Sequence, residues 1–338
     1  MRRSLARLSI PFRLPFVTSS GVVSARELVL LRLEDEDGLV GYGEAAPFEP
    51  YDGVSLEAAV AALTNGGGAD APPQARAAEE MARLDLAARR AGEPVGEAGA
   101  EAIAVNRTIP AGPPEEVARS AAEGVRDGFA CFKVKVGLPD DAERVAAVRE
   151  AIGPWPALRV DANGAWGVDE AVAAIESLAV HDLELVEQPC RTLEELAEVR
   201  RRVSIPIAAD EPIASSEDVR AAAAAEACDA VNVKLAPAGG FAAARATVAA
   251  AREHGLEPFL SSTLDGPWGI AAALQLAATE RLSLACGLAT LELFDAELAR
   301  ALLPPERGLL AVPQGPGLGV SVREEALAAV LVEELRFS

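Results

Sequence analysis

The sequence predicts an α/β protein in which a (β/α)8 barrel of the TIM type follows an N-terminal α+β domain. Beyond about residue 103, short apolar segments alternate with Ala-rich amphipathic stretches, a pattern typical of parallel strands joined by helices. Charged residues end successive segments at intervals of 23 to 26 residues, which fits one strand–helix unit. Eight such units close a barrel, and a doubly wound open sheet is the alternative.

The N-terminal segment is the first element to interpret. Residues 1–16 begin with positive charge, but Arg7, Pro11, Arg13 and Pro15 interrupt any apolar core. A secretory signal needs an uninterrupted apolar core. We therefore expect this segment to belong to the mature chain.

The rest of the first hundred residues predicts a hairpin and a helix. Apolar segments at 28–34 and 39–44 flank the acidic turn 35–38, which is typical of an antiparallel hairpin. Residues 75–91 carry Ala, Met and Leu at helical spacing, and Gly92 follows them. Because glycine readily ends a helix, we expect the helix to stop there.

Eight short apolar segments are the predicted strands of the barrel. Ala-rich stretches long enough for a helix separate them, so each strand can return to the same sheet in parallel. The predicted strands are residues 103–106, 131–135, 158–161, 183–187, 205–210, 230–234, 257–262 and 282–286.

Composition limits the classes of function. The 338 residues are 50% hydrophobic and 25% charged, and 31 basic against 52 acidic residues give a net charge of −21. This composition is typical of a soluble globular protein, and the charge disfavours nucleic acid or an anionic membrane as partner. The four cysteines lack CxxC spacing, which favours a reducing cytoplasm. With two histidines, any metal should be oxygen-liganded, by default Mg²⁺, with Mn²⁺ as the second choice.

Three carboxylates end neighbouring strands of the predicted barrel. Asp161, Glu187 and Asp210 close the third, fourth and fifth strands, and such strand ends converge on one mouth. Their charges would repel one another unless a cation lay between them, and oxygen ligands suit Mg²⁺. We expect these three to bind the metal, with Asn163 and Glu211 around it. Any one of them could be an ordinary solvated strand end, but successive strands repeat the pattern.

Lysines flank the acids. Lys135 ends the second strand and Lys234 ends the sixth. A protonated amine is a poor base, so a lysine that takes a proton needs a lowered pKa. Lys133 shares a face of its strand with Lys135, and like charges held together disfavour protonation of both. We expect all three lysines to be catalytic. The alternative for Lys133 and Lys135 is an ordinary lysine pair on an edge strand.

These acids and lysines predict a reaction class. A divalent ion on a substrate carboxylate makes the neighbouring α-proton more acidic, because it stabilises the enolate that forms. A lysine beside that carbon can take the proton. The substrate should therefore be a small carboxylate, and its shape decides whether reprotonation, loss of a leaving group or ring opening follows.

Five motifs spread along the chain resemble those of a known family. They closely resemble the muconate-lactonizing subgroup of the enolase superfamily. The motifs are KVKV (133–136), RVDANGAW (159–166), VEQPC (186–190), AADEP (208–212) and NVKLAPAGG (232–240).

The resemblance implies a particular domain organisation. It implies an N-terminal α+β capping domain over residues 1–102, joined by residues 300–338, and a catalytic barrel domain over residues 103–299. Loops near 16–21 and 48–53 would close the barrel mouth and set substrate specificity. The resemblance also implies metal ligation by the three acids, and acid/base roles for the lysines that end the second and sixth strands.

Two further segments, 261–278 and 285–299, look most like the o-succinylbenzoate synthases of that subgroup, the dehydratases of menaquinone biosynthesis. By this resemblance Lys135 would remove the α-proton and assist departure of the hydroxyl group, while Lys234 would stabilise the enolate. A dipeptide or N-acylamino acid epimerase or racemase, and a muconate-type cycloisomerase, are the alternatives. Dipeptide epimerases of the subgroup usually carry an Asp-x-Asp pair on the eighth strand, where this chain has Thr-Leu-Glu-Leu-Phe-Asp at 290–295.

Four residues are candidate substrate contacts. Ser261 and Ser262 end the seventh strand, and Asn163 and Trp166 follow the third. The other two tryptophans could line a pocket or cover the barrel ends. A non-catalytic barrel remains the alternative to an enzyme, since a fold alone does not establish activity. The intact acids and lysines argue against a non-catalytic barrel. As to assembly, a homo-oligomer is compatible with the sequence.

Overall fold

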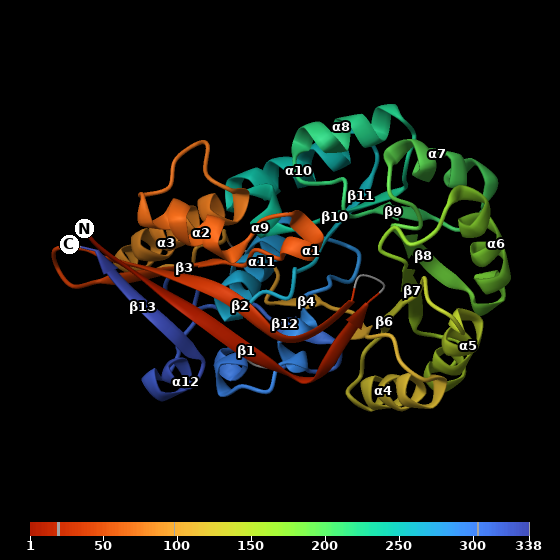
Figure 1. The fold of residues 1–338 in the computed structure, drawn as a ribbon, viewed down its shortest axis with the longest axis horizontal. Coiled ribbons are helices and arrows are strands. Elements are labelled where there is room, and N and C mark those ends of the chain that lie inside the picture. The colour runs from red at the N-terminus through yellow and green to blue at the C-terminus, as the bar shows by residue number, and fades with distance from the viewer. Residues whose placement is uncertain (19–20, 98, 303, 338) are drawn as a thin grey trace.

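The computed structural model describes residues 1–18, 21–97, 99–302 and 304–337. It combines an antiparallel sheet, on the left in Figure 1, with a curled parallel sheet on the right. The antiparallel sheet has the strand order β13-β1-β2-β3. With its helices it forms what we call the cap, which consists of β1 (Arg2–Thr18), β2 (Gly21–Glu34), β3 (Val40–Ala45), α1 (Glu49–Asp52), α2 (Leu56–Thr64), α3 (Pro73–Ala91) and β13 (Leu331–Phe337).

The predicted hairpin is confirmed as β2 and β3. Asp35 shapes the turn, because its side chain accepts hydrogen bonds from the backbone N–H groups of Asp37 and Leu39, both at 2.9 Å. Gly38 takes a left-handed φ of 82°, which glycine adopts without strain. Local residues therefore specify this turn.

Strand β1 was not predicted from the sequence. It pairs with β2 along most of its length, with a register shift between Pro11 and Phe16. Proline has no N–H to donate and interrupts the alternation by which a strand is recognised. The prolines at 11 and 15 are therefore the reason that the sequence pattern does not predict this strand.

The predicted helix at 75–91 is confirmed as α3. Pro73 occupies the first turn, and Gly92 ends the helix with a left-handed φ of 75°. The helix lies directly on β3, because Gly43 has no side chain there: a Cβ on Gly43 would come within 1.9 Å of the carbonyl oxygen of Ala78. This close approach fixes α3 against the sheet.

The parallel sheet has the order β11-β10-β9-β8-β7-β6-β5, and helices lie along its outer side (Figure 1). This arrangement confirms the predicted barrel fold. The strands are β5 (Arg107–Ile109), β6 (Cys131–Lys135), β7 (Ala157–Asp161), β8 (Leu183–Glu187), β9 (Ile207–Ala209), β10 (Ala230–Val233) and β11 (Glu257–Leu260). The helices are α4 (Pro114–Arg126), α5 (Asp141–Ile152), α6 (Val168–Leu178), α7 (Leu193–Arg202), α8 (Ser216–Ala224), α9 (Leu235–Ala238), α10 (Phe241–Glu253) and α11 (Pro267–Glu280).

The barrel closes through a shorter pairing than expected. The strand predicted at 282–286 is wrong as a strand: Cys286 forms an isolated parallel bridge with Val105, and Gly287 forms one with Ser261. The apolar pattern at 282–286 reflects partial burial. Pairing is confined to Cys286 and Gly287, which lie between the segment before β5 and the end of β11.

The predicted first strand at 103–106 is correct only in its first half, and the strand that joins the parallel sheet, β5, begins at residue 107. Its first half is β4 (Ala102–Ala104), which pairs antiparallel with β12 (Leu309–Ala311). The chain then continues into β5, which pairs with β6. A short helix, α12 (Glu324–Ala328), precedes β13. No helix in the described part of the chain is long and apolar enough to cross a membrane.

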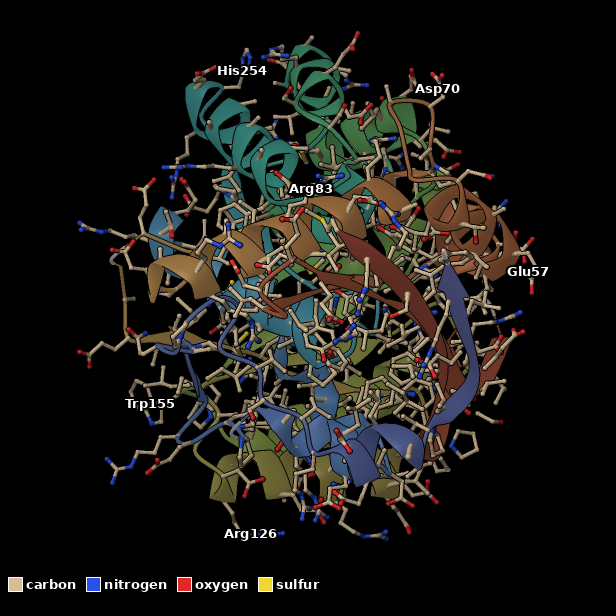
Figure 2. The ribbon with its side chains drawn as sticks, turned by 90° about the vertical axis from the view of Figure 1, so that its left-hand side faces the viewer. Glu57, Asp70, Arg83, Arg126, Trp155 and His254 are labelled. Carbon is tan, nitrogen blue, oxygen red and sulfur yellow. The ribbon has the colours of Figure 1, made fainter. Side chains whose placement is uncertain are left out.

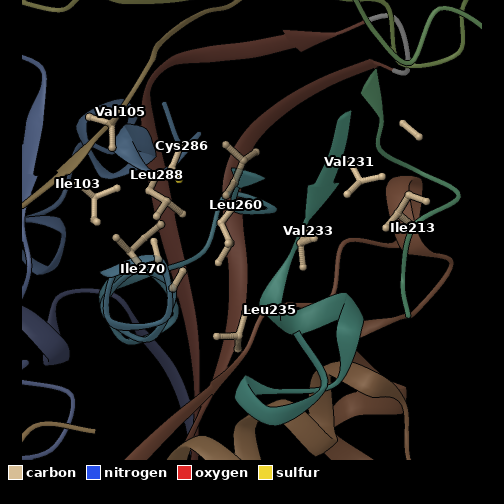
Figure 3. Packing of buried hydrophobic residues seen from close by; sticks show 14 of the residues in the cluster. Ile103, Val105, Ile213, Val231, Val233, Leu235, Leu260, Ile270, Cys286 and Leu288 are labelled. Atoms are coloured by element: carbon tan, nitrogen blue, oxygen red, sulfur yellow. The ribbon is translucent and has the colours of Figure 1, made fainter. Parts of the chain in front are cut away.

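A continuous apolar core joins the barrel to the cap. Figure 3 shows Ile103, Val105, Cys286 and Leu288 gathered beside Ile270 of α11. The same buried cluster continues into β1, β2 and α3. Burial of this apolar surface therefore holds the cap on the barrel.

The pleat of β6 determines which residues face the barrel interior. Phe132 points outward and packs on α4, where a Cβ on Gly124 would lie 2.6 Å from the Phe132 ring. Side chains alternate along a strand, so Lys133 and Lys135 face inward. The strand thereby directs both lysines to the mouth of the barrel.

Candidate active site

A cavity of about 320 Å³ lies where the barrel strands end and the cap meets them. Phe16, Phe48 and Tyr51 of the cap form part of its wall. The barrel supplies most of the predicted site residues to the rest of the lining: Lys133, Lys135, Asp161, Asn163, Asp210, Glu211, Lys234, Ser261 and Ser262.

The two lysines of β6 reach the acids of the neighbouring strands. Lys133 Nζ lies 3.0 Å from Asp161 Oδ2 and 3.0 Å from Glu187 Oε1. Lys135 Nζ donates to Asp161 Oδ2 at 2.6 Å and to Asn163 Oδ1 at 2.8 Å. Both ammonium groups are therefore held by carboxylates inside the barrel.

Lys234 approaches from the other side of the cavity. It directly follows β10, and its Nζ donates to Asp210 Oδ2 at 2.6 Å. Glu187 accepts a further hydrogen bond from Asn232 Nδ2 at 2.9 Å and is fully buried. Because β7, β8 and β9 lie between β6 and β10 in the sheet, their acids lie between the two groups of lysines. None of the three acids points outward to the helices.

The buried charges shift one another's pKa values. Burial alone would raise the pKa of Asp161, but the ammonium groups of Lys133 and Lys135 hold it below its usual range. Burial raises the pKa of Glu187 in spite of Lys133, and the nearby negative charges of Asp161 and Asp210 add to the rise. Burial would lower the pKa of Lys133, yet the surrounding carboxylates raise it. The expected depression of the Lys133 pKa is therefore wrong for this arrangement, because acids outweigh its lysine neighbour.

Comparison with known proteins identifies the family. The family model described as Enolase C-terminal domain-like matches residues 116–326, more than half of the chain. The chain belongs to the enolase superfamily. The resemblance seen in the five motifs is thus confirmed.

Individual relatives of this enolase-superfamily chain have several activities. The o-succinylbenzoate synthase of Thermobifida fusca (strain YX) is 40% identical over 328 residues, which cover 95% of this chain and 91% of that protein. The crystal structure of N-succinyl Arg/Lys racemase from Bacillus cereus matches with a TM-score of 0.93 at 25% identity and covers 100% of this chain and 99% of that one. Dipeptide epimerase from Enterococcus faecalis V583, complexed with Mg and the dipeptide L-Leu-L-Tyr, matches with a TM-score of 0.87 at 28% identity over 95% and 99% of the two chains.

The acids of this superfamily member suit a hard divalent cation in their chemistry. Every candidate ligand is a carboxylate oxygen, the donor type that such an ion prefers, and the four acids lie at the ends of three neighbouring strands: Asp161, Glu187, Asp210 and Glu211. Burial raises the pKa of Glu211 to about 8, and the charges of Asp210 and Asp161 contribute. Among the described residues its buried Oε2 has no hydrogen-bond partner. The residues therefore fit the ion.

The side chains as they stand do not converge on one point. Within the described ranges, no three His, Cys, Asp or Glu side chains are grouped closely enough to hold a metal ion. The reason is that Lys133 lies between Asp161 and Glu187, and Lys234 holds Asp210. Ligation by these three acids stays a prediction.

Tyr51 of α1 is a residue of the site that sequence reasoning did not single out. Its hydroxyl donates to Asp210 Oδ1 at 3.1 Å and accepts from Lys234 Nζ at 2.7 Å. Burial raises its pKa well above the usual value, and the charge of Asp210 adds to this, so the hydroxyl keeps its proton. The cap thus contacts a predicted catalytic lysine directly.

A compositional signal for the lysines was available in the sequence. The chain has 31 basic residues of the Lys and Arg types, and three of them are lysines: Lys133, Lys135 and Lys234. Arginine keeps its charge at any pH a protein meets, whereas lysine can lose a proton when its surroundings favour this. A chain that uses arginine elsewhere and lysine only around the barrel mouth indicates that at least one of these positions needs a removable proton.

The tryptophans lie away from the cavity. Trp166, predicted as a substrate contact, is buried in the main apolar core and is not one of the described residues that line the pocket. Its position beyond β7 suggested the pocket, but its indole packs into the core. Trp155 is 93% exposed at the edge of the molecule (Figure 2), and Trp268 is buried in α11.

The predicted lid loops border the cavity in part. Phe16 lies in the wall at the end of β1, and the 48–53 segment contains α1. Residues 19 and 20, within the predicted 16–21 loop, lie outside the described residues. Closure of either loop over substrate stays a prediction.

Glu44 of β3 is a buried acid just behind the pocket wall. Its carboxylate accepts hydrogen bonds from the backbone N–H groups of Gly266 at 2.6 Å and Gly269 at 3.4 Å, where α11 begins. Burial raises the pKa of Glu44 to about 8; the negative charge of Asp265 adds to the rise, and these hydrogen bonds and Arg26 oppose it. A side chain of the cap therefore accepts hydrogen bonds from the backbone N–H groups at the start of the barrel helix α11.

We expect Glu44→Gln to flatten the pH dependence of stability. The folded chain keeps a proton on Glu44 up to about pH 8, whereas the unfolded chain releases it near pH 4.5. Wild-type stability should therefore fall between these two values as pH rises, by up to about 1.4 kcal/mol per pH unit, and level off above. Urea unfolding at several pH values measures the slope. Equal slopes for the two proteins would contradict the prediction.

Proposed function

We propose that this chain is a dehydratase of the o-succinylbenzoate synthase kind, a carbon–oxygen lyase of menaquinone biosynthesis that depends on Mg²⁺ or Mn²⁺. The observation that carries the proposal is the 40% identity over 95% of the chain to the Thermobifida fusca enzyme. The structurally similar racemase and epimerase are 25% and 28% identical. The substrate would be a small carboxylate with a hydroxyl group next to the carbon that loses its proton.

Lys135 is the proposed base. Its amine takes the α-proton, and the C–H electron pair becomes the new C=C bond of the enolate. When the enolate collapses, the neighbouring C–O bond breaks, and the proton on Lys135 leaves with that oxygen as water. Lys234, held by Asp210 and Tyr51, stays protonated and stabilises the negative charge.

The acids and polar groups around these lysines have proposed roles as well. Asp161, Glu187 and Asp210 would hold the divalent cation, which when bound would offset the negative charge that develops on the substrate carboxylate. Their contacts with the lysines also keep the amines directed into the cavity.

Three polar residues are the proposed substrate contacts. Asn163, Ser261 and Ser262 all line the cavity. The hydroxyl of Ser261 is buried and has no hydrogen-bond partner among the described residues. A buried hydroxyl without a partner is costly, so a substrate oxygen would satisfy it.

A racemase or epimerase is the second candidate, favoured by the TM-score of 0.93 to the Bacillus cereus racemase and by lysines on both sides of the cavity. The 290–295 segment argues against a dipeptide substrate. Thr290 lines the cavity, but Glu292 pairs with Arg107 at 3.3 Å and Asp295 is exposed. The segment therefore presents no carboxylate that would bind a substrate amino group. A muconate-type cycloisomerase is the remaining alternative.

We further propose domain boundaries and a location. A capping domain would comprise residues 1–102 and 300–338, and a barrel domain residues 103–299; the pairing of β13 with β1 supports the inclusion of the C-terminal residues. The four free cysteines support a cytoplasmic location. A small-molecule carboxylate substrate is the proposed partner.

An assay with several substrates tests the proposal. Purified chain with Mg²⁺ would be given the cyclohexadiene precursor of o-succinylbenzoate, an N-succinylamino acid and a dipeptide in parallel. We expect dehydration of the cyclohexadiene compound to be the fastest of the three reactions. Ultraviolet absorbance measures its rate. Epimerisation of either amino acid compound without any dehydration would contradict the proposal.

A further inference from the structure

Arg26 of β2 is a buried arginine whose hydrogen bonds go to backbone carbonyl oxygens. It is 3% exposed. Its guanidinium donates to the carbonyl oxygens of Glu27 at 3.0 Å, Ala46 at 2.8 Å, Pro47 at 2.6 Å and Thr263 at 3.2 Å. One side chain thus joins three separate stretches of chain.

Two of these stretches lead into or form parts of the cavity wall, one from the cap and one from the barrel. Residues 46–48 lead into α1, which carries Tyr51, and the Arg26 guanidinium also lies 4.9 Å from the centre of the Phe48 ring. Thr263 belongs to the 261–264 segment that lines the cavity after β11. Arg26 itself does not appear among the described lining residues. It therefore connects the cap wall of the cavity to the barrel wall from behind.

Only a planar group with several donors suits this position. The four carbonyl groups accept from Nε and from both terminal nitrogens of the guanidinium. A lysine ammonium has three donors on one atom and cannot span the same acceptors. The negative charge of the buried Asp265 attracts the guanidinium as well. Lysine at this position would therefore keep the charge and lose the geometry.

We propose that Arg26 is a positioning residue, which sets the distance between the Tyr51 wall and the 261–264 wall of the active-site cavity. Tyr51 contacts both Lys234 and Asp210, so a displacement of α1 moves the hydroxyl that holds this lysine. A displacement of the 261–264 segment moves the serine hydroxyls that face the substrate. The kinetic consequence rests on the proposed function, whereas the structural coupling does not.

Two substitutions of Arg26 test the proposal, with Arg32→Met as the control. Arg32 lies on the same strand, where it pairs with Glu34 at 2.6 Å and is 38% exposed. Hydrogen–deuterium exchange would be followed in peptides that cover 46–54, 261–266 and β7. In Arg26→Met and Arg26→Lys we expect the first two to exchange on the order of tenfold faster, with β7 unchanged. The control should exchange like the wild type.

Kinetics distinguish positioning from mere stabilisation. At a temperature where circular dichroism shows the variants folded, kcat/KM for dehydration should fall on the order of 10²-fold in Arg26→Met, and less in Arg26→Lys. In a double-mutant cycle with Tyr51→Phe, the two losses should combine to less than their product, because they act on the same contact. A purely structural arginine would leave kcat/KM of the folded variant unchanged.

Each outcome decides the proposal. Faster exchange in both wall segments with a reduced and non-additive kcat/KM supports it. Exchange that stays at the wild-type rate, or rises without any kinetic change, overturns it. If Arg26→Met does not fold, Arg26→Lys alone decides by the same measurements. A wild type without dehydratase activity would refute the proposed function, and the exchange measurement would still test the coupling.

Discussion

Replacing Lys135 with alanine should abolish both product formation and exchange of the substrate α-proton. Lys135 would be the base on its side of the cavity. Lys133 cannot take its place, because the carboxylates around Lys133 raise its pKa and hold its proton. Loss of a general base typically costs on the order of 10² to 10⁴-fold. Ultraviolet absorbance would follow product formation, and mass spectrometry would follow deuterium incorporation in heavy water.

Arginine substitutions should separate the two lysine roles. Lys234→Arg should retain more activity than Lys135→Arg, since a guanidinium can supply positive charge but cannot give up a proton near neutral pH. The Arg32→Met protein serves as the control that should keep full activity. Suppose instead that both arginine variants are equally inactive, and each alanine variant abolishes exchange from one stereoisomer of a chiral substrate. A two-base racemase or epimerase would then be indicated, and the dehydratase proposal would have to be withdrawn.

Removal of divalent cations should have a comparably large effect. Activity should fall by at least about 10³-fold with EDTA and return with Mg²⁺, because charge stabilisation by a metal is worth several kcal/mol. The three lysines of the chain provide a readout that does not depend on turnover. In protein labelled with nitrogen-15 lysine, one equivalent of Mg²⁺ should shift the side-chain signals, since the carboxylates that now hold those amines would bind the ion.

Two variants sharpen the metal experiment. Asp210→Asn should lose the stoichiometric response of the lysine signals, because it removes one expected ligand. Glu217→Gln changes an exposed acid on α8, the helix that follows Asp210. Its lysine signals should respond to Mg²⁺ like those of the wild type. Lysine signals that ignore millimolar Mg²⁺, together with activity in EDTA, would refute the assignment of Asp161, Glu187 and Asp210 as ligands.

Local pattern predicts the barrel strands best where both neighbours are strands. β6 and β8 have the predicted bounds, 131–135 and 183–187. In a buried parallel strand the side chains that face the helices are apolar, and the strand ends at the barrel mouth, where polar side chains begin. The eighth segment, 282–286, has a similar apolar pattern, but Cys286 is its one bridging residue among those that the structure describes. How far a ladder runs depends on the partner strands, and a pattern within one segment does not contain that information.

The candidate site divides in the same way. The three acids, Lys135 and Lys234 follow from their positions at strand ends, and Lys133 follows from the alternation of side chains along its strand, so spacing along the chain was enough to predict that they lie together. The contact between Tyr51 and Lys234 joins residues 183 positions apart and depends on how the cap docks. Trp166 shows the reverse error. It follows a strand end closely, yet the turn after β7 directs its indole into the core.

The pairing of β13 with β1 has a consequence for biosynthesis. Arg3 lies opposite Phe337 in this ladder, so the outer strand of the cap is translated after the whole barrel. Until then β1 has an open hydrogen-bonding edge, which can pair with other chains. The newly made protein would pass through a stage in which the barrel has emerged from the ribosome but the cap sheet is incomplete. A stop codon before residue 331 would remove β13 and leave the edge of β1 unpaired in the finished chain.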